Sequence, residues 1–467
     1  MRVRLFGQYV HVSIAALAAI EAVIFYGSLV LAYWVRFQTL APQSWLGGSS
    51  SLWVCAGVFS LINLVSLLAL GLYSSRQRAR AAGLFVRLVA ALAAAGIVMT
   101  SAFSLIPHLW LGRGVLGLSV LLALIGTGFS RGVYVRIVDE DLFKRRVLVY
   151  GIGQRTAAIS SLRRRSDRRG FEIVGYVQPD GENVAVPVDR ILDASGGILE
   201  LCNRFDVQEI VVAMEDRRRG FPILGLLECR LAGMEVTELL TFLERETGRV
   251  RIDVMNPSWM IFGEGFRRDP LRLFSSRALD LAASGLLVIL SLPVMLFTML
   301  AIKLEDGWRA PIFYGQARVG LGGQTFTVLK FRSMRTDAER DGQAQWAQKS
   351  DPRVTRVGNV IRKLRIDELP QIFNVLTGHM SFVGPRPERP QFVAELAQKI
   401  PYYVQRHCVK PGITGWAQLC YPYGSSEQDA LEKLQYDLYY IKNNTLLFDL
   451  AILVQTAEVV FMGKGAR

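Results

Sequence analysis

The sequence is poor in the side chains that build soft metal sites and covalent cross-links. Its 467 residues include five cysteines, which form no CxxC pair, and four histidines, which form no HExxH or other paired spacing. These patterns argue against a metal site built on cysteine or histidine. An odd, scattered set of cysteines also argues against a disulfide framework, and it therefore favours a cytosolic location for the soluble parts.

No cleavable signal peptide is expected at the N-terminus, because the first apolar run is long and carries no clear cleavage site. Apolar residues make up 51% of the chain and the mean hydropathy is +0.27, which are high values for a soluble protein. The net charge of +14 fits either nucleic acid or an anionic membrane with phosphorylated substrates. Because the arginines cluster beside the apolar runs, we expect a membrane and no nucleic acid.

Four apolar runs before residue 135 are each long enough to cross a bilayer, which needs about 20 residues. They cover roughly 12–34, 52–73, 83–107 and 111–130. Basic residues cluster before the first run, between the second and third, and after the fourth. This asymmetry predicts that the N-terminus and the chain after residue 131 lie in the cytoplasm. The alternative is a soluble bundle in which these runs are buried core helices.

A fifth apolar run covers 278–304 and has proline near its middle, at Pro293. Proline removes a backbone donor and kinks a helix. Arg277 and Lys303 flank the run, so both ends resemble cytoplasmic flanks. One solution is a helix that enters the membrane, bends at Ser291–Pro293 and returns to the same face, with Ser291 as a candidate partner for a freed backbone group. By length alone the run is also able to span.

The middle of the chain alternates between strand and helix patterns. Residues 145–165 predict a strand, a glycine turn and a helix, and further strands are expected at FEIVGYV and at 209–214. This alternation indicates a small doubly wound α/β domain. Gly151 and Gly153 match the start of a dinucleotide fingerprint, but Thr156 stands where the third glycine belongs. The alternative is a Rossmann-like spacer or regulatory module.

Two adjacent acids, Asp367 and Glu368, precede a short apolar helix pattern in IDELPQIFNVLTGHMSFVGPRPERP. A structural explanation exists for the pair on its own. Asp367 can cap a helix, Glu368 favours the positive helix end, and Pro370 is tolerated in the first turn. Adjacent residues of a helix point about 100° apart, so the two acids are expected to do different jobs.

Basic side chains around the acids favour a phosphate site over a simple cap. A helix N-terminus binds anions, but two acids there would repel a phosphate unless positive charge intervened. That charge is available from Lys330, Arg332, Arg362 and Arg365. A divalent metal suited to carboxylate oxygens, Mg²⁺, would complete the arrangement. Arg386 lies between two prolines, which predicts a rigidly presented fork for phosphate oxygens; the alternative is an exposed loop arginine.

Three blocks together, LKFRSMRTDAE, LRIDELPQIFNVLTGHMSFVGPRPERP and RHCVKPGITGWAQ, closely resemble the bacterial sugar transferase family. These enzymes are polyprenyl-phosphate hexose-1-phosphate transferases, also called monotopic phosphoglycosyl transferases. The resemblance covers about 270–467 and is far more specific than the GxG turn. The whole layout is similar to the large membrane form that initiates exopolysaccharide or O-antigen assembly.

The resemblance implies a reaction and roles for individual residues. The family moves a sugar-1-phosphate from a UDP-sugar to undecaprenyl phosphate and releases UMP. By resemblance, Asp367 is the nucleophile that forms a phosphosugar intermediate, and Glu368 binds Mg²⁺. Lys330, Arg362 and Arg386 fall on the family's basic positions around the phosphates.

The family also has a re-entrant membrane helix bent at a Ser-Pro pair. Arg277 and Asp280 fit the entry of that helix. The chain departs from the pattern because Leu292 separates Ser291 from Pro293. The proline bend is expected to survive this departure.

The predicted fold is therefore a four-span membrane α-helical bundle at 1–135, a Rossmann-like α/β domain at 145–260, and an α/β-type monotopic catalytic domain at 270–467 with a re-entrant membrane helix at 278–304. We expect the bacterial inner membrane, with the soluble domains on the cytoplasmic side. The expected partners are a UDP-sugar, undecaprenyl phosphate and membrane lipid, and a homodimer is possible.

Two alternatives use the same features differently. A membrane-tethered, NAD-dependent nucleotide-sugar oxidoreductase would place its chemistry in the Rossmann-like segment. It needs a catalytic Tyr-x-x-x-Lys, and residues 146–265 contain no tyrosine followed four residues later by lysine. A non-catalytic scaffold for polysaccharide assembly would leave the charged set around Asp367 without a purpose.

Overall fold

The structure is a computed structural model of the chain. It describes residues 2–5, 8–39, 52–69, 72–73, 81–105, 112–137, 144–160, 162, 167, 170–179, 181–216, 218, 220–255, 257–262, 265–266, 269–336, 353–422, 424 and 426–461. The chain divides into two compact units, Met1–Thr247 and Gly248–Arg467. The domain boundaries expected from the sequence stay a prediction.

The first unit begins with a short hairpin and four long apolar helices. They are the antiparallel strands β1 (Arg2–Leu5) and β2 (Gln8–His11), then α1 (Val12–Phe37), α2 (Leu52–Ala69), α3 (Ala81–Leu105) and α4 (Arg113–Ile137). Large side chains such as Phe25 and Leu29 pack inside the bundle, whereas Ile97 and Phe129 face outward. Apolar side chains on the outside of a bundle suit contact with lipid.

Among the described residues, three helices are long and apolar enough to cross a membrane, by length and composition: Ala15–Phe37, Arg113–Tyr134 and Pro270–Asp306. The stretches Leu52–Leu68 and Arg87–Ala102 are apolar but shorter. The several apolar helices indicate a membrane protein. The four spans before residue 135 stay a prediction, because only two helices there meet these criteria among the described residues.

A five-stranded sheet follows in the same unit. Its strands are β3 (Arg145–Tyr150), β4 (Phe171–Val177), β5 (Ile191–Leu192), β6 (Glu209–Val212) and β7 (Glu235–Glu238). Every pair is parallel and the order is β5-β4-β3-β6-β7, so the order reverses at β3. This is a doubly wound arrangement. The predicted parallel α/β architecture is confirmed, and its assignment as a Rossmann domain stays a prediction.

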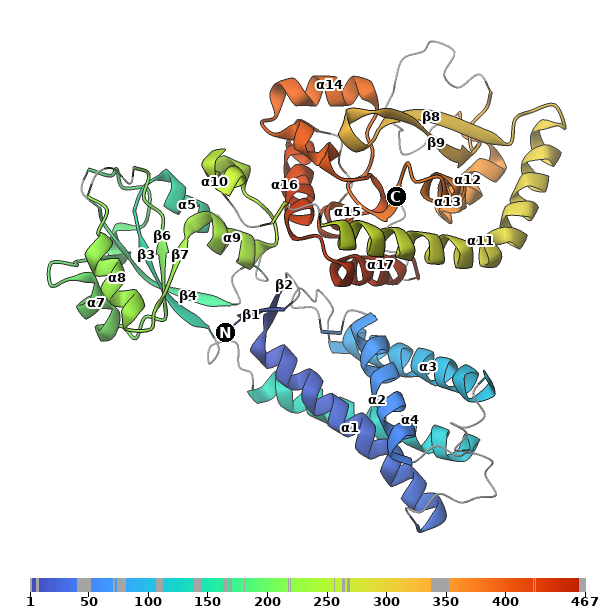
Figure 1. The fold of residues 1–467 in the computed structure, drawn as a ribbon, viewed down its shortest axis with the longest axis horizontal. Helices are drawn as coiled ribbons and strands as arrows, with labels where there is room; N and C mark the ends of the chain where they lie inside the picture. Colours follow the sequence, from blue (N-terminus) through green and yellow to red (C-terminus); the bar gives the residue numbers. More distant parts are fainter. Residues whose placement is uncertain are drawn as a thin grey trace. The chain divides into compact units, whose positions relative to one another are not determined.

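Helices cover both faces of this sheet (Figure 1). They are α5 (Gln154–Ser160), α7 (Ile198–Arg204), α8 (Ile223–Leu231) and α9 (Leu239–Thr247), with a short 3₁₀ turn η3 (Val188–Arg190). Strands β3 and β6 are almost wholly buried, as expected for parallel strands covered on both sides. One core cluster joins α7 and α8 to the sheet.

The second unit carries two small sheets among helices. Its elements are η4 (Ile252–Val254), α10 (Pro257–Phe262), α11 (Pro270–Asp306), β8 (Phe313–Val319), η5 (Leu321–Gly323), β9 (Thr325–Phe331), α12 (Arg356–Lys363), η6 (Ile366–Glu368), α13 (Gln371–Leu376), β10 (Ser381–Val383), α14 (Pro390–Lys399), η7 (Tyr403–Cys408), β11 (Gly412–Thr414), α15 (Trp416–Cys420), α16 (Glu427–Asn443) and α17 (Leu446–Phe461). Strands β8 and β9 pair antiparallel, and β10 and β11 pair parallel.

Helix α17 has two different faces. Phe448 and Ile452 are buried, and Phe448 packs edge-on against Trp416. Leu447 and Leu450 are exposed on the other side. The helix therefore combines a packed core face with an apolar outer face.

Helix α11 has 37 residues and begins at Pro270, with Asp269 as its N-cap. The Asp269 carboxylate accepts from Leu271 N at 3.0 Å, and proline in the first turn needs no hydrogen-bond partner. Figure 1 shows that the helix turns partway along its length, so that its two arms run in different directions. Pro293 lies inside it and removes one hydrogen bond of the helix.

The first arm of α11 is anchored by two polar residues. Arg277 donates to Val375 O and Leu376 O, both at 2.6 Å, at the C-terminal end of α13. Asp280 Oδ1 accepts from Ser381 Oγ at 2.9 Å and from Phe382 N at 3.0 Å. Arg277 and Asp280 thus fasten the helix to α13 and β10.

The second arm is fastened to the same unit. Glu305 accepts from the first backbone amides of α12 at 2.7 and 2.9 Å, and Met295 and Ile302 pack in one cluster with β9 and α12. Between the arms the apolar side chains are exposed, with Ile289 at 73%. The Ser291 hydroxyl donates to Met295 Sδ at 3.6 Å. The expectation that Ser291 meets a freed backbone group stays a prediction, and the hydrogen bond that the structure gives its hydroxyl goes to a thioether four residues later.

Candidate active site

Asp367 and Glu368 lie in η6, a single 3₁₀ turn that follows α12 directly. Arg365 precedes this turn with φ at +58°, in the left-handed region. A residue other than glycine is strained there by about 1–3 kcal/mol, and such strain is found where the surrounding structure imposes it, often at functional sites. The reversal at Arg365 turns the two acids toward β9.

Asp367 is buried, with 8% of its surface exposed. None of the described residues forms a hydrogen bond or ion pair with its carboxylate. The helix-cap explanation is not supported, because α13 has Pro370 at its N-cap position and no side-chain cap. A buried carboxylate without a structural bond has both oxygens available for chemistry.

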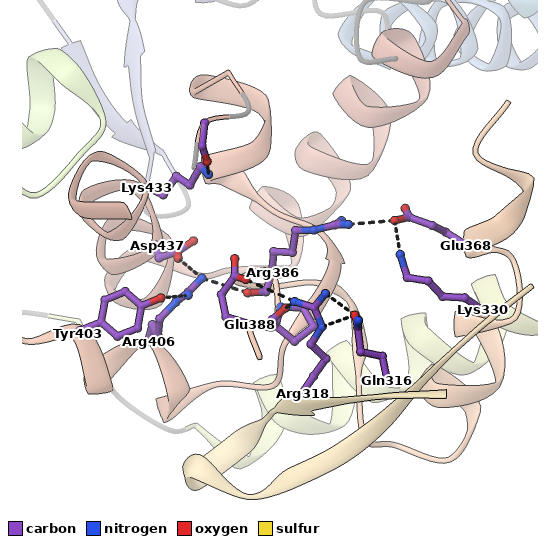
Figure 2. A network of polar contacts seen from close by, with 12 residues as sticks. Gln316, Arg318, Lys330, Glu368, Arg386, Glu388, Tyr403, Arg406, Lys433 and Asp437 are labelled. Carbon is purple, nitrogen blue, oxygen red and sulfur yellow. Dashed lines mark hydrogen bonds and ion pairs between the residues drawn. The ribbon is translucent and has the colours of Figure 1, made fainter. Parts of the chain in front are cut away.

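Glu368 is held by cations. Its Oε1 accepts from Lys330 Nζ at 3.0 Å and from Arg386 Nη2 at 2.9 Å, and Figure 2 shows the carboxylate between these two side chains. Arg365 Nη1 lies 3.8 Å from the other oxygen, Oε2. Residues far apart in the sequence, on β9 and in the loop after β10, thus meet at one carboxylate.

The surroundings move the pKa values of the two acids in opposite directions. Burial raises the pKa of Asp367, and the adjacent Glu368 charge raises it further, against the lowering effect of Lys330, Arg362 and Arg365. Burial alone would raise the pKa of Glu368 too, but the charges of Arg386 and Lys330 hold it well below its usual range. Two neighbouring carboxylates whose pKa values are shifted in opposite directions are typical of an acid pair with two roles.

Lys330 is the central cation of the cluster. It lies half-buried on β9, and burial lowers the pKa of its ammonium group against the raising effect of Glu368. The ammonium group of Lys330, beside the two carboxylates, is suited to bind a phosphate oxygen that enters the site.

The structure places the other predicted basic residues differently. Arg362, in the last turn of α12, lowers the pKa of Asp367 through its positive charge. Arg332 does not join the cluster, because its Nη2 pairs with Asp306 at 2.7 Å. Lys330 lies within β9 and Arg332 follows the strand's end, so strand alternation no longer sets its direction.

Arg365, beside the acids, has structural features that the sequence does not indicate. Arg365 combines the left-handed backbone with proximity to both acids. Its basic character was visible in the sequence, but no pattern signals a non-glycine residue at positive φ.

The donor chemistry of the acid pair fits Mg²⁺. No group of three or more histidine, cysteine, aspartate or glutamate side chains suited to a metal occurs among the described residues. Mg²⁺ is commonly bound through one or two carboxylates, with water and substrate phosphates completing its shell. Asp367 and Glu368 supply hard oxygens, and Glu368 Oε2 is the less engaged of that carboxylate's oxygens.

The glycine turn after β3 is occupied by the chain itself. Glu182 Oε2 accepts from Ile152 N at 2.9 Å and from Gly153 N at 3.2 Å. Glu215 Oε1 accepts from Gln154 N at 2.6 Å. These amides are the ones that a dinucleotide pyrophosphate would need. The turn therefore does not favour the oxidoreductase alternative.

Comparison with known proteins adds independent evidence. The family described as bacterial sugar transferase matches residues 271–463. This stretch contains α11 apart from its first residue, both acids and the basic residues around them.

Three relatives illustrate the similarity. An Aeromonas hydrophila UDP-N-acetylgalactosamine-undecaprenyl-phosphate N-acetylgalactosaminephosphotransferase is 44% identical over 242 residues, 52% of this chain and 56% of the relative. A Xanthomonas campestris pv. campestris UDP-glucose:undecaprenyl-phosphate glucose-1-phosphate transferase is 30% identical over 378 residues, 76% of this chain and 75% of the relative. A Salmonella typhimurium undecaprenyl-phosphate galactose phosphotransferase is 28% identical over 372 residues, 74% of each chain.

The chain spans a little over half of the Aeromonas protein and about three quarters of the other two, at 56%, 75% and 74%. The similarity to the Xanthomonas relative includes residues outside the second unit, because 378 aligned residues exceed the length of that unit. The chain therefore belongs to the bacterial sugar transferase family.

Proposed function

We propose that this protein transfers a sugar-1-phosphate from a UDP-sugar to undecaprenyl phosphate and releases UMP, through a covalent intermediate on Asp367. The observation that carries the proposal is that the two acids are bonded differently. Glu368 is clamped by Lys330 and Arg386, whereas the buried Asp367 carboxylate has no structural hydrogen bond from a described residue.

In the first step, an Asp367 oxygen attacks the phosphorus that bears the sugar. A bond from carboxylate oxygen to phosphorus forms, and the bond from phosphorus to the bridging oxygen breaks. UMP leaves with the electron pair of that bond. Lys330, Arg362 and Arg386 carry fixed positive charge, which stabilises the oxygens of the transferring phosphoryl group. The covalent step divides one difficult transfer into two easier ones.

In the second step, a phosphate oxygen of undecaprenyl phosphate attacks the same phosphorus. The bond to Asp367 breaks, the carboxylate is regenerated, and the product is a sugar joined to undecaprenyl through a diphosphate. Mg²⁺, held by Glu368 with Asp367 nearby, would neutralise charge on the donor's diphosphate when bound. Glu368 keeps Lys330 and Arg386 directed at the site in both steps.

Helix α11 supports a catalytic segment seated on one face of the membrane. Both arms are fastened to the second unit, by Arg277 and Asp280 on one side and by Glu305 on the other, while the apolar middle is exposed. We propose that this middle enters the bilayer and returns, with Pro293 in the bend. The protein then lies in the bacterial inner membrane with its active site on the cytoplasmic side, where a water-soluble donor meets a lipid acceptor.

The sugar is open among the donors that the relatives' names suggest, which include UDP-N-acetylgalactosamine, UDP-glucose and a galactose donor. The layout favours the first membrane step of exopolysaccharide or O-antigen synthesis. Differences of a hydroxyl or an acetamido group are read by a few pocket contacts, so the reaction class is expected to hold for each sugar.

The test is UMP release by detergent-solubilised full-length protein from UDP-glucose, UDP-galactose and UDP-N-acetylgalactosamine, each with undecaprenyl phosphate and Mg²⁺. We expect release with one of these donors and its loss in Asp367→Asn. UMP release that persists in Asp367→Asn would show that Asp367 is not the nucleophile. No UMP release with any of the UDP-sugars would contradict the proposed reaction.

A further inference from the structure

The loop that presents Arg386 is held by its backbone carbonyls. Four carbonyls in succession each accept a hydrogen bond from another element, and the pairs are Pro385 O with Gly412 N at 3.0 Å, Arg386 O with Arg406 Nη2 at 3.0 Å, Pro387 O with Arg318 Nη1 at 2.9 Å, and Glu388 O with Val319 N at 2.9 Å. The donors come from β8, η7 and β11. The loop is therefore fixed from three sides.

The prolines explain why the loop is held through its backbone carbonyls. Proline has no backbone N–H, so Pro385 and Pro387 remove two of the donors with which a loop normally holds itself. Their rings also fix the φ angle on either side of Arg386. The chain's remaining means of fixing this loop is to supply donors from outside, and two of the four donors are arginine side chains.

Arg406 is the more buried of these two arginines, with 6% of its surface exposed. Its Nη2 donates to Arg386 O and to Asp437 Oδ2 at 2.8 Å, and its Nη1 donates to Tyr403 OH at 2.8 Å. Figure 2 shows Arg406 between Asp437 and the backbone of Arg386. The buried Asp437 carboxylate neutralises Arg406 and fixes the orientation of its fork.

Arg318 holds the other end of the loop. Its Nη1 donates to Pro387 O and lies 3.3 Å from Glu388 Oε2, while Nε and Nη2 donate to Gln316 Oε1 at 3.0 and 2.5 Å. Gln316 and Glu388 thus orient the guanidinium as Asp437 orients Arg406. Each arginine has its own hydrogen-bond partners, so the two hold different carbonyls of one loop.

We propose that Arg406 and Arg318 are positioning residues for Arg386, which fix its backbone so that its guanidinium reaches Glu368 and the donor's diphosphate. Neither arginine touches the acid pair among the described contacts, and Arg386 Nη2 meets Glu368 Oε1 at 2.9 Å. The inference deepens the proposed function and rests on it for its kinetic consequence. Its structural part stands without the reaction.

The kinetic test is a double-mutant cycle on kcat/KM for UMP release, in which Arg406→Met is made alone and in Arg386→Ala. Arg386→Ala is expected to lower kcat/KM by about 100- to 1,000-fold. Arg406→Met should lower it by roughly 10- to 100-fold, because small misplacements of a binding group are costly. In the Arg386→Ala background the same change should matter by less than about twofold, since its effect passes through Arg386.

A structural role elsewhere would make the two effects multiply, and that result would overturn the inference. Because Arg406→Met leaves Asp437 buried without its partner, the cycle is repeated with Arg406→Met/Asp437→Asn, which removes both charges. Tyr403→Phe is the matched control: it deletes one acceptor of Arg406 but keeps the contact with Arg386 O, so kcat/KM should stay within about twofold.

Hydrogen exchange of the full chain tests the positioning itself, whether or not UMP release is found. In Arg406→Met and in Arg318→Met, the amides of Val319 and Gly412 should exchange faster, since they donate to the loop's carbonyls. Peptides of α16 away from Asp437 should keep their protection. Unchanged exchange at Val319 and Gly412 in both variants would contradict the inference, while loss of UMP release in the wild type would bear only on the proposed function.

Discussion

The acid pair shows how neighbouring residues of the same chemistry acquire different properties. Asp367 is buried and its pKa is raised, first by burial and then by the charge of Glu368. Glu368 receives Lys330 and Arg386 on one oxygen. The sequence predicts two jobs from the helical angle between adjacent residues; that stays a prediction, and the structure adds that the surroundings shift the two pKa values in opposite directions.

The pH dependence of the reaction should report the raised pKa of Asp367. A nucleophilic carboxylate must be ionised, so activity should fall as pH drops through the folded-state pKa. That pKa lies above the value of about 3.9 for a free aspartate. Lys330 lowers the pKa of Asp367, so Lys330→Met should move the acid limb of kcat/KM to higher pH, besides lowering the rate.

Lys363→Met is the matched control for this measurement. It removes an equal charge from the end of α12, and Lys363 is not among the groups that act on the pKa of Asp367. We expect its acid limb to coincide with that of the wild type. An acid limb that stays in place in Lys330→Met, or moves to lower pH, would contradict the assignment.

At the scale of elements, the first arm of α11 is anchored by Arg277 and Asp280, whose partners lie 98 to 102 positions away in the sequence. Asp280 accepts from Ser381 Oγ and Phe382 N, so it joins the helix to β10. Sequence patterns identified the helix, its proline and its charged entry. They had no means of identifying the partners, because contacts between distant segments leave no periodic signal.

Removing the Asp280 anchor should destabilise the second unit. Asp280→Ala leaves the buried amide of Phe382 and the hydroxyl of Ser381 without an acceptor, which costs about 1–3 kcal/mol for an unsatisfied buried donor. Thermal unfolding in detergent should show a lower transition temperature. Asp280→Asn keeps one acceptor oxygen and should lie between Asp280→Ala and the wild type; equal transitions for all three proteins would show that the anchor is dispensable.

The path of α11 can be tested by labelling on its two sides. Cys408 is exposed in the catalytic segment after α11, and Leu224 is 75% exposed on α8 before it. If α11 enters and leaves the membrane on the same face, Cys408 and the thiol of Leu224→Cys should both be protected in intact cells from a membrane-impermeant maleimide. Both should react in inverted vesicles. Labelling of only one of the two from a given side would mean that α11 spans.

At the scale of the whole molecule, the sequence predicted most of the architecture. Long apolar runs and strand alternation predicted the apolar helices and the parallel sheet, and the three specific blocks predicted the family. The strongest patterns belong to continuous elements, and these are the parts that the structure confirms. Separate functions for the parts of the chain stay predictions.

Two features of the molecule required three-dimensional structure. The glycine turn after β3 resembles a phosphate site in sequence, but Glu182 and Glu215 occupy its amides from outside the turn. Arg406 lies in a block that carried the family resemblance, yet its contact with the carbonyl of Arg386 joins positions that no spacing relates. Both the hydrogen bonds to these amides and the hydrogen bond to this carbonyl are tertiary contacts, so residue types alone do not reveal them.

The central claim is a covalent intermediate on Asp367, and the most direct measurement is the mass of the protein after mixing with a UDP-sugar and Mg²⁺ in the absence of undecaprenyl phosphate. The account predicts a burst of UMP of about one per active protein and a sugar-phosphate adduct on the peptide that contains Asp367. Asp367→Asn should give neither. An active enzyme that releases UMP only when the lipid acceptor is present, with no adduct, would contradict the account and indicate a single direct transfer.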